Sequence, residues 1–328
     1  MAALTRKIRW GVLGYAKIAR ENVIPALQRS AHAEFRALGS RDPAKRAECA
    51  ARYPGLRITG SYEELLRDPE VDAVYIPLPN ALHREWTLKA AEQGKHVLCE
   101  KPIALNAAEC REMIAACAAH GVVLMEAFMY RYTDRIRQVR EVLRQGLLGD
   151  LRFVQASFCF MLANPASIKL RPELGGGALY DIGCYPVNFA GLVADTQTGG
   201  PGTSRPSAVA GFAERVGGID ESFSGLLRYP SGLTASLHCS IRAHRAMDAT
   251  IVGTAGVLEV PDTFLDPAGA LTLVHGDERR ELPVAASDRY RHEVEDFSAA
   301  LLERRPPALG LPESLRNMET IDRLFAAS

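Results

Sequence analysis

The sequence has no surplus of charge of either sign. Lysine and arginine together number 39, aspartate and glutamate together also number 39, and no run of five or more like charges occurs. A nucleic-acid-binding chain normally carries a concentrated basic patch or stripe. We therefore expect no nucleic-acid partner and a small molecule as the ligand.

Cysteine is scarce and scattered, and long apolar runs are missing. The seven cysteines are an odd number, with no C-x-x-C pair and no histidine cluster at zinc spacing. This pattern indicates reduced thiols in the cytoplasm and no metal site. No apolar run reaches the roughly 20 residues of a membrane-spanning helix, and Lys17 interrupts the early apolar stretch that could resemble a secretory leader. We expect a cytoplasmic protein without membrane association.

What is present is a chain long enough for two domains, 328 residues. Its first part, residues 1–126, alternates short apolar runs with helical patterns, which is typical of βαβ units and a doubly wound parallel sheet. The expected strands are Ile8–Leu13, Ala33–Ser40, Ala73–Ile76, His96–Cys99 and Val122–Glu126. Helix-capping signals at Asp42-Pro43, Ser61, Asn106, Gly94 and Gly121 separate them. We expect a Rossmann dinucleotide-binding domain here.

Residues 127–328 have a different pattern. A helix is expected at 133–145, and long β-like stretches then follow at 151–160, 208–216, 221–229, 233–241 and 249–252. Pro230-Ser231-Gly232 is a hairpin signal. Further helical patterns cover 177–194, 289–303 and 313–327. This half is expected to be an α+β domain with a large, open-faced, mostly antiparallel sheet that binds substrate and mediates oligomerisation.

A glycine-rich turn follows the first strand. After Gly11, the segment from Gly14 fits a G-x-G-x-x-A pattern in which Ala16 takes the middle glycine position, and Lys17 and Ile18 open the next helix. A pyrophosphate needs such a tight turn, a close backbone approach and a helix N-terminus. We therefore assign all five residues to cofactor binding, although the pattern alone also fits an ordinary strand-to-helix turn.

The end of the second strand indicates which dinucleotide binds. An acidic residue at this place would accept from the ribose 2′-hydroxyl of NAD, whereas this chain has Ser40 and Arg41, with Lys45 one helical turn later. Basic groups beside a hydroxyl suit a 2′-phosphate, which favours NADP while leaving NAD possible. Solvated surface cations remain the alternative interpretation.

The segment Glu100-Lys101-Pro102 follows the strand at 96–99, at the carboxyl end of a parallel strand where ligands bind such sheets. With the glycine turn and the segments VDAVYIPLPNALH (71–83), GKHVLCEKP (94–102), MEAFMYR (125–131) and GGGALYDIGCYPVN (175–188), it resembles the glucose-fructose oxidoreductase, inositol dehydrogenase and rhizopine-catabolism (Gfo/Idh/MocA) family. The resemblance spans nearly the whole chain. It implies a Rossmann domain, an open-faced antiparallel sheet, a nicotinamide between them, a catalytic Lys101 and a cis Lys101–Pro102 bond.

The last motif departs from the pattern of many members, because Tyr185 stands where a D-x-x-x-H pair has histidine, four residues after Asp181. This departure resembles the branch of dihydrodiol dehydrogenases, D-xylose dehydrogenases and deoxysugar 3-ketoreductases, which implies acid/base work by Lys101 and Tyr185. An ammonium near a phenol would favour its ionised form. Asp181 is expected on the same helix face as Tyr185, with a kink at Pro186. A core tyrosine without a catalytic role is the alternative.

Further cofactor contacts are expected at Pro77, Leu78, Asn80, His83, Glu100, Lys101, Pro102 and Arg131. For His83 a helix cap or surface group is the alternative, and for Arg131 and Arg171 a surface or interdomain ion pair.

We therefore expect an NADP(H)-dependent oxidoreductase that exchanges a hydride with a carbinol or carbonyl carbon of a sugar or cyclic polyol, and that forms a homodimer or homotetramer. A 3-ketoreductase of a nucleotide-linked deoxysugar, a non-catalytic NAD(P)-reading regulator and a redox-assisted glycoside-cleaving enzyme are the alternatives.

Overall fold

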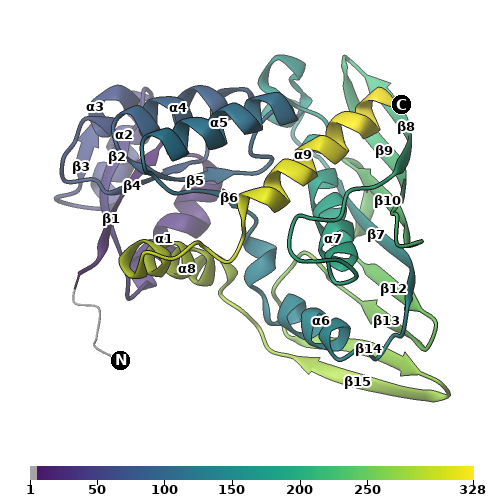
Figure 1. The fold of residues 1–328 in the computed structure, drawn as a ribbon. Coiled ribbons are helices and arrows are strands. Elements are labelled where there is room, and N and C mark those ends of the chain that lie inside the picture. The colour runs from purple at the N-terminus through teal and green to yellow at the C-terminus, as the bar shows by residue number, and fades with distance from the viewer. Residues whose placement is uncertain (1–5) are drawn as a thin grey trace. The chain divides into compact units, whose positions relative to one another are not determined.

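A parallel sheet of six strands forms the centre of the first of two units in this computed structural model, which describes residues 6–328. The strands follow the order β3-β2-β1-β4-β5-β6 (Figure 1). Their bounds are β1 (Ile8–Leu13), β2 (Ala33–Gly39), β3 (Arg57–Thr59), β4 (Ala73–Ile76), β5 (His96–Glu100) and β6 (Leu124–Ala127). Both the Rossmann sheet and five of its strands are as the sequence predicts, and the three-residue β3 is additional.

Helices cover both faces of this sheet. In Figure 1, α2, α3, α4 and α5 lie on one side of it and α1 and α8 on the other. Their bounds are α1 (Ile24–Arg29, after a π-helical turn Ala19–Val23), α2 (Pro43–Arg52), α3 (Tyr62–Leu66), α4 (His83–Glu92), α5 (Ala107–Ala119) and α8 (Arg289–Glu303). The expected caps are present: Asp42 accepts from Ala44 N at 2.9 Å and Ser61 accepts from Glu64 N at 3.1 Å.

The chain returns to the first unit near its end. Trp10 on β1 is fully buried, donates from Nε1 to Ser298 Oγ at 3.1 Å, and packs on Phe297 with ring centroids 5.2 Å apart. Of the described residues, the first unit therefore holds Tyr290–Leu311 as well as residues 6–104 and Ala108–Phe128. The sequence predicts two contiguous domains, 1–126 and 127–328. That division does not include the return of Tyr290–Leu311 to the first unit.

The second unit is built on a nine-stranded sheet with the order β15-β14-β13-β12-β7-β10-β9-β8, and β11 pairs with β7. All strand pairs are antiparallel except β7 with β10, so the expected mostly antiparallel sheet is confirmed. The bounds are β7 (Leu151–Met161), β8 (Ala208–Val216), β9 (Ile219–Arg228), β10 (Thr234–Ser240), β11 (Arg242–Ala246), β12 (Ala249–Gly253), β13 (Gly256–Val260), β14 (Gly269–His275) and β15 (Glu278–Val284).

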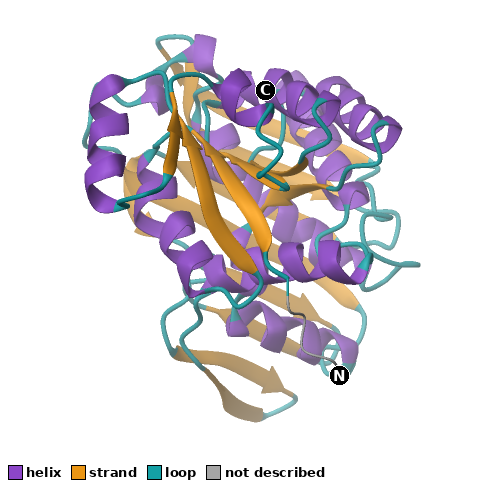
Figure 2. Cartoon of the chain, turned by 90° about the vertical axis from the view of Figure 1, so that its left-hand side faces the viewer, coloured by secondary structure: helices purple, strands orange, loops and turns teal. Residues whose placement is uncertain are grey.

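One face of this sheet is covered and the other is open. The helices α6 (Asp134–Arg144), α7 (Cys184–Asp195) and α9 (Leu311–Ala326) lie on the same side of it in Figure 1, and Figure 2 shows the chain from another side with its helices and strands in separate colours. On β9 the buried residues Phe223 and Leu227 alternate with Leu226, which is 55% exposed, and Phe212 on β8 is 74% exposed. The open-faced sheet expected from the sequence is therefore present.

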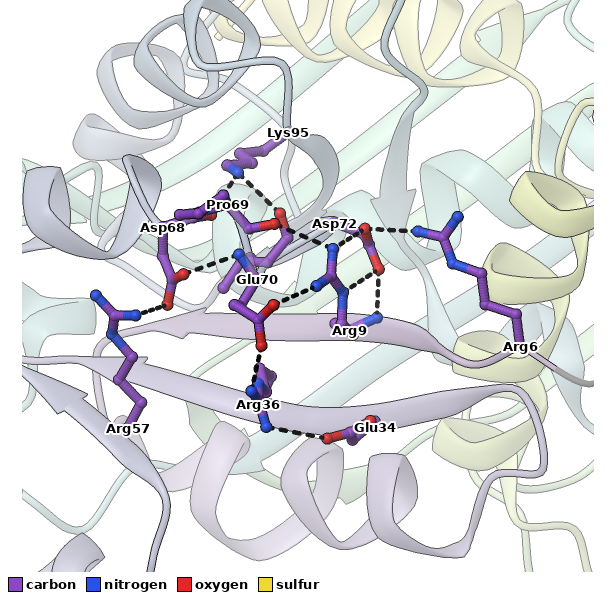
Figure 3. Close-up of polar contacts among 11 residues, drawn as sticks. Arg6, Arg9, Glu34, Arg36, Arg57, Asp68, Pro69, Glu70, Asp72 and Lys95 are labelled. Carbon is purple, nitrogen blue, oxygen red and sulfur yellow. Dashed lines mark hydrogen bonds and ion pairs between the residues drawn. The ribbon is translucent and has the colours of Figure 1, made fainter.

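The amino edge of the six-stranded sheet carries a network of charges (Figure 3). Arg9 on β1 binds Asp72, which precedes β4, at 2.8 Å and Glu70 at 3.1 Å. The ammonium of Lys95 donates to the carbonyl oxygens of Asp68 and Val71 at 2.7 and 2.8 Å. These contacts fix the loop before β4, so the polar groups of this edge have structural partners, whereas the Gly14 turn, Ser40, Arg41 and the Glu100–Pro102 segment lie at the carboxyl ends of the strands.

Three expectations apply to both units: reduced cysteines, no membrane-spanning helix and no metal site. All seven cysteines are buried thiols outside disulfide bonds, and burial raises the pKa of the Cys49 and Cys117 thiols to about 11, which makes both thiols unreactive. Within residues 6–328, no helix is long and apolar enough to cross a membrane. The same described residues contain no group of three or more histidine, cysteine or acidic side chains that could hold a metal ion.

Candidate active site

The turn after β1 lies beside the segment after β4. Gly14 has φ +101°, a conformation that favours glycine, and its N–H donates to Gly39 O at 2.7 Å. A Cβ added to Gly14 would lie 3.2 Å from Leu78 Cδ2. The turn therefore needs glycine both for its positive φ and for the close approach of Leu78 in the loop after β4. A dinucleotide phosphate requires a tight glycine turn of this kind.

Gly11 has a different structural role from Gly14. It lies within β1, where an added Cβ would come within 2.7 Å of Leu65 Cδ2 and 3.1 Å of Val71 Cγ1. Packing of α3 on the sheet is thus sufficient to explain this glycine. Lys17, in contrast, is 80% exposed at the start of the following helix.

Arg41 lies on two aromatic rings that the sequence analysis did not identify. Its guanidinium carbon is 4.9 Å from the ring centroid of Tyr62 and 5.2 Å from that of Trp86, and these two rings meet edge to face at 4.9 Å. Glu63 lies 3.8 Å from the guanidinium, whose side chain stays 59% exposed. The rings restrict the guanidinium while one face of it remains accessible to an anion.

Ser40 and Lys45 occupy different environments beside Arg41. Ser40 is only 2% exposed: its Oγ accepts from Asp42 N at 3.3 Å and its carbonyl oxygen accepts from Arg46 Nη1 at 2.8 Å. Ser40 therefore shapes the turn. Lys45 is exposed on the first turn of α2.

The segment that carries Lys101 is held by buried side chains of neighbouring elements. Tyr75 on β4 donates to Glu100 Oε1 at 2.5 Å, and Glu100 Oε2 accepts from Lys101 N at 3.2 Å. Burial, and then the Glu100 carboxylate, raise the pKa of Tyr75 well above its ordinary value, so the phenol keeps its proton and donates it. The Lys101–Pro102 bond is cis, as the resemblance implies.

Two further contacts hold the same segment. Glu126 on β6 accepts from Ile103 N at 2.9 Å. His83 is fully buried, with Nδ1 2.9 Å from Pro102 O and Nε2 2.9 Å from Leu78 O. The alternative of a surface histidine is therefore wrong, and with both ring nitrogens against carbonyl oxygens, His83 connects the segments after β4 and β5. Asn80 begins the 3₁₀ turn Asn80–Leu82 between them.

In the second unit, Asp181 and Tyr185 lie on two kinds of helix. Asp181 belongs to a π-helical turn, Leu179–Gly183, and Tyr185 is the second residue of α7. Pro186 is the third residue of α7, and the π-helical geometry ends at Gly183, directly before α7 begins. The expected kink at Pro186 stays a prediction.

Tyr185 is surrounded by aromatic side chains and sulfur. It is 2% exposed, its hydroxyl lies 3.4 Å from Met129 Sδ, and its ring centroid is 5.2 Å from that of Phe158 and 5.6 Å from that of Phe264. Tyr130 lies at 5.7 Å. These contacts fix the ring, which is the requirement for placing a phenolic proton precisely enough for transfer.

Two charged residues that sequence reasoning missed adjoin the Asp181 turn. Lys169 Nζ lies 2.7 Å from Asp181 Oδ2. Asp220 on β9 is 3% exposed and its Oδ2 accepts from Leu179 N at 2.6 Å; burial raises its pKa to about 6. Neither residue belongs to a recognised motif, and both are separated from Asp181 along the chain. The sequence alone therefore did not predict these contacts.

Arg131 is part of a buried network within the second unit. Its Nη1 lies 2.7 Å from Glu313 Oε2 and 3.0 Å from Asn188 Oδ1, and Tyr130 donates to the same Asn188 oxygen at 2.5 Å. With side chains only 4% and 2% exposed, the Arg131–Glu313 pair connects the 3₁₀ turn Met129–Tyr132 to α9. Arg171 lies exposed.

Comparison with protein families supports the same interpretation over most of the chain. Residues 8–128 match the oxidoreductase family with an NAD-binding Rossmann fold, and residues 136–259 match the Gfo/Idh/MocA C-terminal domain. The chain belongs to the Gfo/Idh/MocA family. This family member is therefore an oxidoreductase, as the resemblance in its motifs implies.

Its relatives include enzymes of three kinds. A D-xylose 1-dehydrogenase (NADP(+)) of Haloferax volcanii is 37% identical, with 97% of both chains covered. A trans-1,2-dihydrobenzene-1,2-diol dehydrogenase of Sus scrofa is 37% identical over 85% of this chain and 81% of its own. A 3-ketoreductase from Actinomadura kijaniata, solved in complex with NADP and TDP-benzene, has a TM-score of 0.90 at 30% identity, with 98% of both chains covered.

Proposed function

We propose that this oxidoreductase uses NADP(H) to interconvert a secondary alcohol and a carbonyl group on a sugar or cyclic polyol. The observation that carries the cofactor half of the proposal is Arg41, held 4.9 and 5.2 Å above the rings of Tyr62 and Trp86 at the end of β2. A guanidinium at this place suits a 2′-phosphate, and no acidic residue at the strand end competes for a 2′-hydroxyl. Two of the relatives described above carry NADP in their names or complexes.

The chain's residues fit the dinucleotide in further respects. The Gly14 turn provides the close approach to a pyrophosphate, and Pro77, Leu78, Asn80 and the Glu100–Pro102 segment line the carboxyl edge of the sheet, where nicotinamide would bind. When bound, NADP(H) supplies hydride exchange with the substrate carbon. The protein's own groups supply binding, orientation and proton transfer.

Proton transfer is assigned to Tyr185, assisted by Lys101. In reduction the phenol donates its proton to the developing alkoxide oxygen, and in oxidation the phenolate accepts the hydroxyl proton. The Lys101 ammonium stabilises negative charge on either oxygen. Asp181 accepts a hydrogen bond from a substrate hydroxyl and so orients the substrate.

The proposed substrate class is supported by the relatives, whose names include a sugar, a dihydrodiol and a deoxysugar with a keto group. We place this chain's substrate among free sugars and cyclic polyols. A nucleotide-linked keto-sugar is the second candidate, favoured by the high structural similarity to the Actinomadura kijaniata 3-ketoreductase. The retained Lys101, Asp181 and Tyr185 argue against a non-catalytic regulator.

The deciding experiment follows NADPH absorbance while the protein is given free aldoses, cyclic polyols and dihydrodiols with NADP, and keto-sugars and nucleotide-linked keto-sugars with NADPH. Net appearance of NADPH with an aldose or polyol supports the proposal. Turnover confined to nucleotide-linked keto-sugars would favour the second candidate. Substrate conversion without net change in NADPH would indicate redox-assisted glycoside cleavage.

We also propose a homodimer or homotetramer assembled through the open face of the nine-stranded sheet, where Phe212 and Leu226 lie exposed. The chain's partners are then a small carbohydrate and copies of itself, in a cytoplasmic setting.

A further inference from the structure

Lys169 stands apart from the other basic residues of the second unit. Lysine occurs at seven positions of the sequence, and Lys169 is the one that follows Lys101. The second unit otherwise uses arginine for its cations. Arginine is a planar fork, whereas lysine is a compact ammonium with three rotatable donors that can be shared between partners.

The backbone of Lys169 is docked on the turn that leads into the Asp181 helix. Lys169 lies in the 3₁₀ turn Ile168–Leu170, and its carbonyl oxygen accepts from Gly177 N at 3.0 Å. A Cβ added to Gly176 would lie 2.6 Å from the same oxygen, so only glycine permits this approach. The glycine run of the GGGALYDIG segment thus holds Lys169 beside Asp181.

The side chains complete the arrangement. Lys169 Nζ lies 2.7 Å from Asp181 Oδ2 and 5.0 Å from the ring centroid of Phe160. The lysine side chain is 38% exposed and the aspartate side chain 14% exposed. The ammonium is therefore the accessible end of the pair, while the Asp181 oxygen that faces it is buried.

The chemistry of the pair matches two adjacent hydroxyl groups. A hydroxyl can donate one hydrogen bond and accept others, so a cationic donor and an anionic acceptor side by side can each bind one member of a vicinal diol. A lone carboxylate would bind hydroxyl protons only. A lone ammonium would bind phosphate or carboxylate groups at least as well.

We propose that Lys169 and Asp181 together form a subsite for a vicinal diol of the substrate, in which Lys169 donates to one hydroxyl oxygen and Asp181 accepts from the neighbouring hydroxyl. Lys169 is thereby a substrate-binding residue that sets specificity for adjacent hydroxyls. This inference rests on the proposed function, because it concerns the substrate of the same reaction.

The test compares the wild-type protein with Lys169→Met, which removes the ammonium and keeps an unbranched stem. The probes are an aldose or polyol that the wild type turns over and the analogue lacking one of the two adjacent hydroxyls. Wild type should show a kcat/KM for the parent compound roughly ten- to a hundredfold above that for the deoxy analogue, the range for a hydrogen bond to a charged group. Lys169→Met should lower kcat/KM for the parent to near the value of the analogue.

Two further variants separate this role from a structural one. Lys169→Arg should recover part of the discrimination, because a cationic donor is restored. Arg242→Met is the matched control: Arg242 pairs with Glu221 at 2.5 Å, with side chains 44% and 11% exposed, on β11 of the same unit. It should leave the discrimination unchanged. NADPH affinity should be the same in all variants.

Retained discrimination in Lys169→Met, with turnover intact, would overturn the role of Lys169 and leave the proposed function standing. Absence of NADP(H)-linked turnover with every diol-containing compound in the wild type would overturn both.

Discussion

The hydroxyl of Tyr75 donates to Glu100 Oε1 at 2.5 Å, and the other oxygen of that carboxylate accepts from the amide of Lys101 at 3.2 Å. We expect Tyr75→Phe to lower kcat by about tenfold or more, because the half-buried Glu100 carboxylate beside the lysine loses a charged hydrogen bond worth roughly 1.5–3 kcal/mol. NADPH affinity should change much less. Steady-state kinetics with cofactor titration measures both.

Tyr53→Phe is the control for this variant, since it removes a hydroxyl on the connection between α2 and β3. Equal kcat in Tyr75→Phe and the wild type would show that the Tyr75–Glu100 bond has no part in placing Lys101.

His83 makes a prediction about pH and stability. Burial lowers its pKa from 6.5 to about 4, with the Lys101 ammonium acting in the same direction, whereas the carbonyl oxygens of Pro102 and Leu78 oppose the shift. The unfolded chain then binds more protons than the folded one between these two values. The free energy of unfolding should therefore fall by about 3 kcal/mol as the pH drops from 6.5 toward 4, because the folded chain resists protonation of the ring.

The measurement is an NMR titration of the His83 ring, together with unfolding free energies at pH 7 and pH 5 for the wild type, His83→Asn and the exposed-site control His120→Asn. A His83 ring that titrates at or above 6.5 would contradict this account. Such a ring would be an imidazolium donating to both carbonyl oxygens.

Cofactor choice provides the next prediction. Arg41→Ala should weaken NADPH binding by about 1.5–3 kcal/mol and leave NADH binding almost unchanged, because NADH has no 2′-phosphate. Titration with both cofactors checks this, with Arg52→Ala at the other end of α2 as the control. Equal binding of NADPH and NADH by the wild-type protein would show that Arg41 does not bind the 2′-phosphate.

The open sheet face makes a prediction about assembly. Phe212 is 74% exposed and Leu226 55% exposed on adjacent strands, which favours burial against a second copy. Phe212→Glu combined with Leu226→Lys should shift the molecular mass in light scattering to that of a monomer. Ile168→Lys, a change at a 51% exposed apolar residue outside the sheet, should not. A monomeric wild type at micromolar concentration would contradict the assembly.

The sequence was sufficient for most of the fold because the buried elements carry strong patterns. β4 and β6 are buried along their whole length, and β4 reads as a continuous apolar run while β6 is interrupted only by Glu126. Five strands were not predicted, namely β3, β11, β13, β14 and β15. Of these, β3 has only three residues, and β15, with the sequence ERRELPV, is an exposed edge strand whose charges conceal its pairing.

The candidate site was predictable only where a motif spans it. Gly14, Lys101, Asp181 and Tyr185 belong to recognisable segments. Trp86 beneath Arg41 and Lys169 beside Asp181 come from distant or unpatterned positions, and only tertiary packing brings them to their partners.

The central claim is that Tyr185, assisted by Lys101, transfers the proton in an NADP(H)-linked reaction. Single-turnover hydride transfer from bound NADPH tests this claim most directly, in the wild type, Tyr185→Phe, Lys101→Ala and the double variant. Each single change should lower the rate by something like 10²- to 10⁴-fold, with NADPH affinity little changed for Tyr185→Phe, and the double variant should be hardly slower than the worse single one. A wild-type rate in Tyr185→Phe would contradict the account and leave the tyrosine a structural member of its aromatic cluster.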